Sequence, residues 1–288
     1  MIPASSGRRR VAATHESFLR HAGYRYAILA GVVSAAAIIV YVAVDIVPRH
    51  NGGSWLGYSL GVIGTALILW LTLLGLRKRL ITPGVWSLKG WTSAHVYLGL
   101  ALVVIATLHS GFQFGLNIHT LAYALMMIVI LSGVAGVIAY SVIPQRMSDN
   151  RGEVSTREMV EAIAGLDREL REAAQPLEDA AAELVRVAID ETVLLRGPLA
   201  RLNPQPRDCA TARALAGLRA RLEESGDPQD QLGPALSLLE RKRALLLRLR
   251  RYARYKALLE LWLYVHVPFT FALIAALAAH IVAVFYLW

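Results

Sequence analysis

Residues 257–288 read ALLELWLYVHVPFTFALIAALAAHIVAVFYLW, a stretch in which Glu260 is the one acidic or basic residue besides two histidines. A helix that crosses the hydrocarbon core of a bilayer needs about 20 mostly apolar residues. The stretch is long enough, and it therefore predicts a membrane-spanning helix. The two histidines inside it are His266 and His280.

Four earlier stretches of the same kind are also expected to span a membrane: residues 26–47, 55–76, 91–112 and 119–143. The composition agrees, because the 288 residues are 56% hydrophobic and 18% charged, against about 25% charged in a typical soluble domain. Arg8–Arg10 resemble the start of a signal sequence, but the apolar stretch that follows is a full crossing, so we expect an uncleaved anchor. The predicted fold is all-α, a polytopic membrane bundle of five transmembrane helices with a helical insertion.

The basic residues cluster on one side of these spans. They gather in residues 8–25, 77–89, 146–151 and 248–256, whereas the segments on the opposite side contain only Arg49. An excess of Lys and Arg marks the cytoplasmic loops of membrane proteins. We therefore expect a bacterial inner-membrane protein surrounded by lipid, with a cytoplasmic N-terminus and a periplasmic C-terminus. The net charge of +9 is then explained without a nucleic-acid partner.

The spans divide the chain into four expected segments. These are a cytoplasmic N-terminal segment (1–25), a four-helix membrane region (26–144), a cytoplasmic helical insertion (145–256) and a fifth transmembrane helix (257–288). Pro48 and Pro144 are expected to end their spans, because proline interrupts helical hydrogen bonding.

The insertion is predicted to be helical. Ser155 and Glu158 have the spacing of a capping box that starts a helix. From Pro234 onward an apolar and basic pattern continues into residues 257–288, which predicts one long helix leaving the membrane. The single cysteine, Cys209, excludes an intramolecular disulfide and an iron–sulfur cluster built by this chain alone.

Five of the eight histidines lie in or beside the expected spans: His95, His109, His119, His266 and His280. Ionisable residues within a span are costly and by default indicate function. The remaining three lie in terminal or loop sequence, and we expect them to be solvated: His15, His21 and His50.

Four of these histidines form two pairs with the same spacing. His95 and His109 are 14 residues apart, as are His266 and His280. Fourteen residues turn a helix by about 1400°, roughly 40° short of four turns, and rise about 21 Å. Each pair therefore shares one helix face. Because both spans are expected to run outward, His95 should lie level with His266 (the inner pair) and His109 with His280 (the outer pair).

Two facing imidazoles can hold a haem iron from both sides. A zinc site requires three or four converging ligands, and a proton relay requires carboxylates, of which only Asp45 and Glu260 border the spans. A haem with two histidine ligands has no open iron position, so it suits electron transfer. The pattern predicts two b haems, with centres about 20 Å apart along the helices.

The two H-x13-H pairs resemble those of the di-haem transmembrane cytochromes b. They lie on the third and fifth spans, as in the membrane domain of the ferric reductase and NADPH oxidase superfamily; respiratory cytochrome b has equivalent pairs on its second and fourth helices. The resemblance covers the spans, somewhat over half of the chain. It implies that His95, His109, His266 and His280 ligate haem iron. Counterparts of the FAD and NADPH module and of the sixth helix are not recognised, so nicotinamide-driven reduction by this chain alone is not expected.

Other polar residues near the spans are candidates for contacts with haem propionates or a quinone: His119, Lys89, Arg49, Arg77 and Arg254. An interfacial location in water explains His119 equally well, and a role in membrane topology explains the inner basic residues. The expected partners are a periplasmic redox protein such as a c-type cytochrome, and a cytoplasmic iron–sulfur or flavin subunit at residues 145–256.

The expected function is transmembrane electron transfer, as the cytochrome b subunit of a redox complex that links quinone or a cytoplasmic donor to a periplasmic partner. Whether the chain is itself an enzyme is left open. One alternative is a quinol:acceptor oxidoreductase subunit in which His119 or Asp45 accepts protons. A second, of a different class, is a haem-free metal or proton transporter.

Overall fold

The computed structural model describes residues 18–47, 49–79, 87–151, 154–191, 193, 197–202, 209–225 and 231–286. These residues form helices and no strand, so the predicted all-α fold is confirmed. The chain divides into two compact units, Met1–Val134 with Pro268–Trp288, and Ala135–Val267. Residues 145 and 256, the expected limits of the insertion, lie inside helices and not at their ends.

Five helices in the described part of the chain are long and apolar enough to cross a membrane. They are α1 (His21–Ala43), α2 (Trp55–Arg79), α3 (Leu88–Ser110), α4 (Ile118–Arg151) and α9 (Leu232–Tyr286). The chain is therefore a multi-pass membrane protein. The prediction of one long helix that includes the fifth span is confirmed by α9, which is 55 residues long.

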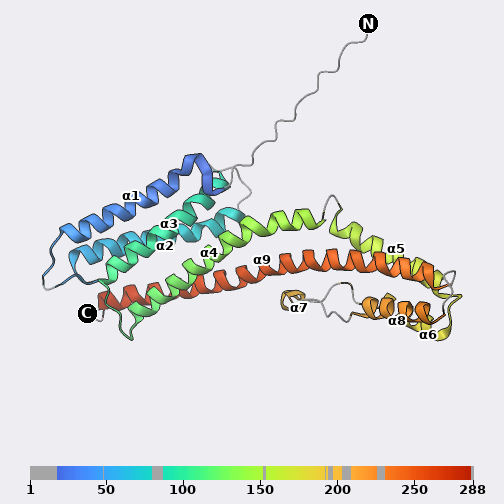
Figure 1. Cartoon of the computed structure of the whole chain (residues 1–288). Coiled ribbons are helices and arrows are strands. Elements are labelled where there is room, and N and C mark those ends of the chain that lie inside the picture. The colour runs from blue at the N-terminus through green and yellow to red at the C-terminus, as the bar shows by residue number, and fades with distance from the viewer. Residues whose placement is uncertain are drawn as a thin grey trace, which may run out of the picture. The chain divides into compact units, whose positions relative to one another are not determined.

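In the first unit, α3 packs against both α1 and α2 (Figure 1). Leu102 of α3 is buried together with Leu71 of α2. Met126 of α4 and Leu273 of α9 belong to the same apolar cluster. This cluster joins α2 to the three helices that carry His95, His109, His119 and His280.

Both ends of α3 have specific caps. The Ser87 hydroxyl accepts a hydrogen bond from the Gly90 amide at 3.1 Å, as an N-cap does. At the other end, Gly111 has a φ of 57°, the left-handed conformation that favours glycine. A Cβ at this position would lie 2.4 Å from the carbonyl oxygen of His50. Gly111 thus ends α3 just after His109 and lets the 49–54 segment pass close to it.

Two prolines lie inside spans without ending them. The expectation that Pro144 ends the fourth span is wrong, because α4 continues to Arg151. Proline removes the one hydrogen bond that its own nitrogen would donate to the fourth residue before it, here Tyr140, and the rest of the helix stays bonded. Pro268 lies inside α9 in the same way. Pro48 is outside the described residues.

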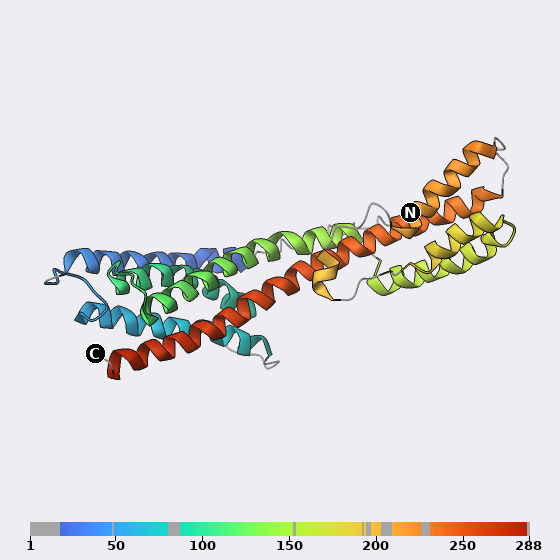
Figure 2. The ribbon, with the colours of Figure 1, turned by 90° about the horizontal axis from the view of Figure 1, so that it is seen from below.

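The second unit is a small helical bundle. It contains α5 (Thr156–Ala174), α6 (Asp179–Ile189), α7 (Pro198–Leu202) and α8 (Ala210–Ser225). Figure 2 shows α5, α6 and α8 gathered along the first turns of α9, and buried side chains of all four helices form one apolar cluster. The predicted capping box is confirmed: the Glu158 amide donates to the Ser155 hydroxyl at 3.1 Å, and the Ser155 amide donates to the Glu158 carboxylate at 2.8 Å.

Two ion pairs connect α9 to the rest of this bundle. The Lys242 ammonium is completely buried, where it pairs with Asp167 of α5 and donates to the Ala188 carbonyl at the end of α6. Two turns further along α9, Arg250 pairs with Glu191 at 2.8 Å. These contacts fix the start of α9 against α5 and the chain that follows α6.

Candidate functional site

The two histidines of α3 have matching hydrogen bonds to the backbone of α2. His95 Nδ1 lies 3.0 Å from the carbonyl oxygen of Leu71, and His109 Nδ1 lies 2.7 Å from that of Gly57. The two carbonyls are 14 residues apart, as the histidines are. A carbonyl can only accept, so each Nδ1 carries the proton and each lone pair is on Nε2. This is the arrangement of a histidine whose Nε2 ligates a metal and whose Nδ1–H is held by a partner.

One glycine of α2 makes room for the His109 ring. A Cβ at Gly61 of α2 would lie 2.8 Å from the Cε1 atom of His109, too close for any side chain. The imidazole therefore occupies space that only the absence of a side chain on α2 provides.

His109 and His280, the outer pair, lie close to each other within the first unit. Their ring centroids are 6.0 Å apart, and the ring planes are perpendicular, at 90°. With a metal–nitrogen bond of about 2.0 Å, two imidazoles on opposite sides of one metal ion have ring centroids roughly 6 Å apart. This distance would allow the two residues to hold one haem iron between them, and it also lies within the range of an edge-to-face ring contact.

A third imidazole, that of His119, lies next to His280. The Nδ1 atoms of the two residues are 2.5 Å apart, and the ring centroids 4.5 Å. The structure thus gives His119 a contact with His280. The predicted contact with a propionate or a quinone, and the alternative of an interfacial location in water, stay predictions. Three histidines from α3, α4 and α9 thus meet at one end of the first unit.

The residues of the inner pair belong to different units, His95 to the first and His266 to the second. Within the second unit, His266 stacks on Trp262, with ring centroids 5.1 Å apart. Trp262 in turn lies against Gly136 of α4, where a Cβ would be 2.3 Å from its ring. Whether His95 and His266 ligate one haem stays a prediction.

The predicted basic contacts lie in several places. Lys89 is half-buried in the first turn of α3, and Arg77 is half-buried near the end of α2. Arg49 is exposed between α1 and α2, and Arg254 is exposed on α9 in the second unit. Asp45, a proton acceptor in the quinol alternative, is exposed as well. A role of these residues toward propionates or a quinone stays a prediction.

Two histidines that were expected to be solvated are partly buried. His50 stacks on Tyr41 with ring centroids 4.1 Å apart, and its Nδ1 is buried without a hydrogen-bond partner in the described structure. His21 stacks on Tyr26 and lies beside Gly90 of α3. Loop position alone did not reveal these contacts, because they depend on tertiary packing around α1. His15 lies outside the described residues.

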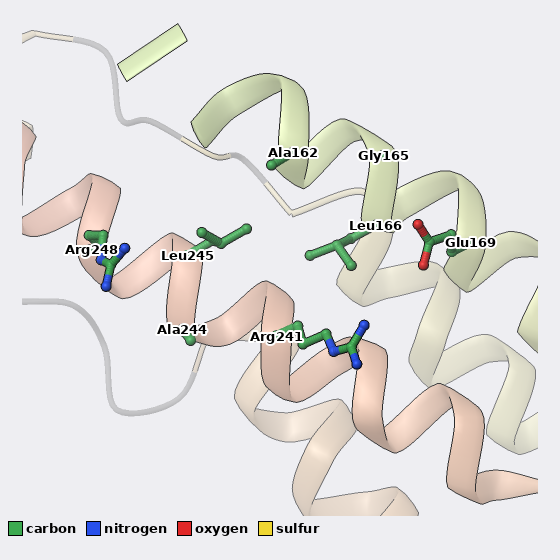
Figure 3. Close-up of a pocket in the computed structure, with 8 residues that line it drawn as sticks. All are labelled: Ala162, Gly165, Leu166, Glu169, Arg241, Ala244, Leu245 and Arg248. Carbon is green, nitrogen blue, oxygen red and sulfur yellow. The ribbon is translucent and has the colours of Figure 1, made fainter. Parts of the chain in front are cut away.

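A groove on the second unit is the other candidate surface. It lies between α5 and α9 and has a volume of about 590 Å³. Each helix contributes residues at positions i, i+3, i+4 and i+7: Ala162, Gly165, Leu166 and Glu169 from α5, and Arg241, Ala244, Leu245 and Arg248 from α9. Figure 3 shows the two leucines pointing toward each other, with Glu169 and Arg241 toward one end and Arg248 toward the other.

The described residues contain no group of three or more His, Cys, Asp or Glu side chains arranged to hold a metal ion by themselves. No protein-family model matches the chain, and no characterised protein or solved structure matches it significantly. The histidine geometry of the first unit is therefore the basis for assigning a function.

Proposed function

We propose that the chain is a di-haem transmembrane cytochrome b that carries electrons across a bacterial inner membrane. The observation that supports this most strongly is the paired geometry of α3. His95 and His109 are held through Nδ1 by α2 carbonyls at the same 14-residue spacing, and the ring centroid of His109 lies 6.0 Å from that of His280.

The four histidines have defined roles in this proposal. His95 and His266 hold the inner haem, and His109 and His280 hold the outer haem. A haem held there would supply the one-electron couple of its iron. With two imidazole ligands the iron would have no open position for a substrate. The Leu71 and Gly57 carbonyls fix the orientation of the α3 ligands and raise their basicity. Gly61 provides the space for the His109 ring.

The distribution of basic residues supports an orientation with the N-terminus in the cytoplasm and the C-terminus in the periplasm. Residues 145–256 are then cytoplasmic, and we assign them to docking of an electron-donor subunit with an iron–sulfur cluster or a flavin. Arg241 and Arg248, seven residues apart at the edge of the α5–α9 groove, favour a donor surface with acidic side chains. The acceptor is a periplasmic redox protein such as a c-type cytochrome.

Electron transfer across the membrane can be measured in sealed lipid vesicles that contain the purified chain and enclose ferricyanide. Dithionite added outside should reduce the enclosed ferricyanide much faster than in protein-free vesicles. His280→Ala should remove this acceleration, because one haem of the pathway is lost. Equal rates for the wild-type chain, His280→Ala and protein-free vesicles would reject the proposed function.

A further inference from the structure

His280 differs from the two α3 ligands in the partner of its Nδ1 atom. His95 and His109 are held by backbone carbonyls, whereas the partner of His280 is a side-chain nitrogen, His119 Nδ1 at 2.5 Å. From this contact we infer that His119 is a positioning residue for the outer haem: it orients His280 and increases the electron donation of His280 to the iron. The inference rests on the proposed function.

The chemistry of imidazole allows one assignment of protons to this pair. If Nε2 of His280 binds iron, its Nδ1 carries the proton and acts as the donor. His119 Nδ1 must then be the acceptor, so the second proton of the pair is on His119 Nε2. The two rings are nearly perpendicular, at 89°.

The backbone that carries His119 is fixed on both sides of the residue. Asn117 caps the start of α4, because its side-chain oxygen accepts a hydrogen bond from the Thr120 amide at 2.9 Å. One turn later, the Tyr123 hydroxyl lies 2.9 Å from the Thr107 hydroxyl of α3. A ring on such a rigid helix start can hold a ligand in one orientation.

An imidazole nitrogen is a stronger base than a peptide carbonyl oxygen. Its hydrogen bond draws the Nδ1 proton of His280 further away and leaves more electron density on the ring. Partners of this kind raise ligand basicity, and hydrogen bonding around a ligand is one way a protein sets a haem potential. More donation favours ferric iron, so His119 should lower the reduction potential of the outer haem.

The test compares two substitutions in the full-length chain. His119→Leu removes the acceptor, whereas His119→Asn keeps an acceptor oxygen near the former Nδ1 position. Redox titration of the visible spectrum resolves the two haems, and the outer haem is the one that His280→Ala removes. Thr120→Ala is the matched control. It removes a hydrogen bond at the same helix start, where the Thr120 hydroxyl accepts from the Gly115 amide, and leaves His119 in place.

For His119→Leu we expect two haems per chain and an outer haem that is easier to reduce. A tenfold change in the reduction equilibrium corresponds to about 59 mV for one electron, and we expect a rise of about this size. His119→Asn should restore most of the wild-type potential, and Thr120→Ala should leave it unchanged. Loss of the outer haem in His119→Leu but not in His119→Asn would also support the positioning role.

Unchanged potentials in His119→Leu would overturn the inference and leave the proposed function intact. Loss of the outer haem in both His119 variants would also overturn it, because His119 would then be a ligand. A wild-type chain without haem would instead reject the proposed function itself.

Discussion

The Nδ1 atom of His109 lies 2.7 Å from the carbonyl oxygen of Gly57, and the same contact recurs 14 residues earlier on α3 between His95 and Leu71. Because α2 and α3 run in opposite directions, one register of the two helices produces both contacts. α2 therefore orients both histidines that α3 contributes, although no side chain of α2 ligates iron in the proposed function.

The space that Gly61 leaves for His109 gives a direct prediction. Gly61→Ala places a methyl group 2.8 Å from the ring, so the ring must turn away from its position opposite His280. We expect the outer haem to be lost or its spectrum to shift, measured as haem per chain. Gly75→Ala on the same helix is the control, because a Cβ there meets no atom within 4 Å. Equal haem content and spectra in both variants would contradict the role of Gly61.

Lys242 should be essential for the stability of the second unit. Lys242→Met leaves the Asp167 carboxylate and the Ala188 carbonyl without their buried donor, and breaking a buried pair in this way costs about 3–5 kcal/mol. We expect the thermal unfolding midpoint of the unit, measured by circular dichroism in detergent, to fall by roughly 10 °C. Arg243→Met, a change at the exposed neighbouring residue, should have little effect. A fall of similar size in both variants would show that the burial of Lys242 is not the cause.

Glu191 should make the second unit sensitive to acid. Burial by itself would raise the pKa of this carboxyl, but hydrogen bonds from Thr211 and Arg250 outweigh burial and lower the pKa below its ordinary value. A lowered pKa stabilises the fold at pH values above the unfolded pKa of about 4.3, and this stability is lost as pH falls through the folded pKa. Glu191→Gln should therefore be less stable than the wild type at pH 7, with a smaller loss of stability between pH 6 and pH 3.

A matched control for this titration is Glu183→Gln. The hydrogen bond from Arg186 also lowers the pKa of Glu183, but both side chains are exposed, and exposed pairs contribute little to stability. Urea unfolding of the full chain at several pH values measures the effect. If Glu183→Gln flattened the pH dependence as much as Glu191→Gln, the buried contacts of Glu191 would not be its source.

The parts of the fold that depend on local sequence were predictable. The length of the apolar stretches was sufficient to predict the five spans. The spacing of Ser155 and Glu158 predicted the capping box, and the unbroken pattern after Pro234 predicted the long helix α9. The interruption expected at Pro144 was wrong, since one missing hydrogen bond does not end a helix whose other bonds are intact.

The partners of buried polar groups could not be predicted, because they depend on tertiary register. The sequence pattern predicted which helices carry His109 and His280. The hydrogen bond between His109 and the Gly57 carbonyl depends on how α2 packs against α3, which the pattern does not show. Lys242 lies between two arginines in sequence and is the one of the three that is fully buried. A basic run does not reveal which of its members faces a carboxylate.

The most direct test of the di-haem proposal is the haem content of the purified full-length chain. It is measured by pyridine haemochrome quantification together with a dithionite-reduced minus oxidised visible spectrum. The proposal predicts two b haems per chain, and one in each of His95→Ala and His280→Ala. A folded but colourless preparation from haem-replete cells would contradict the proposal and favour a haem-free transporter.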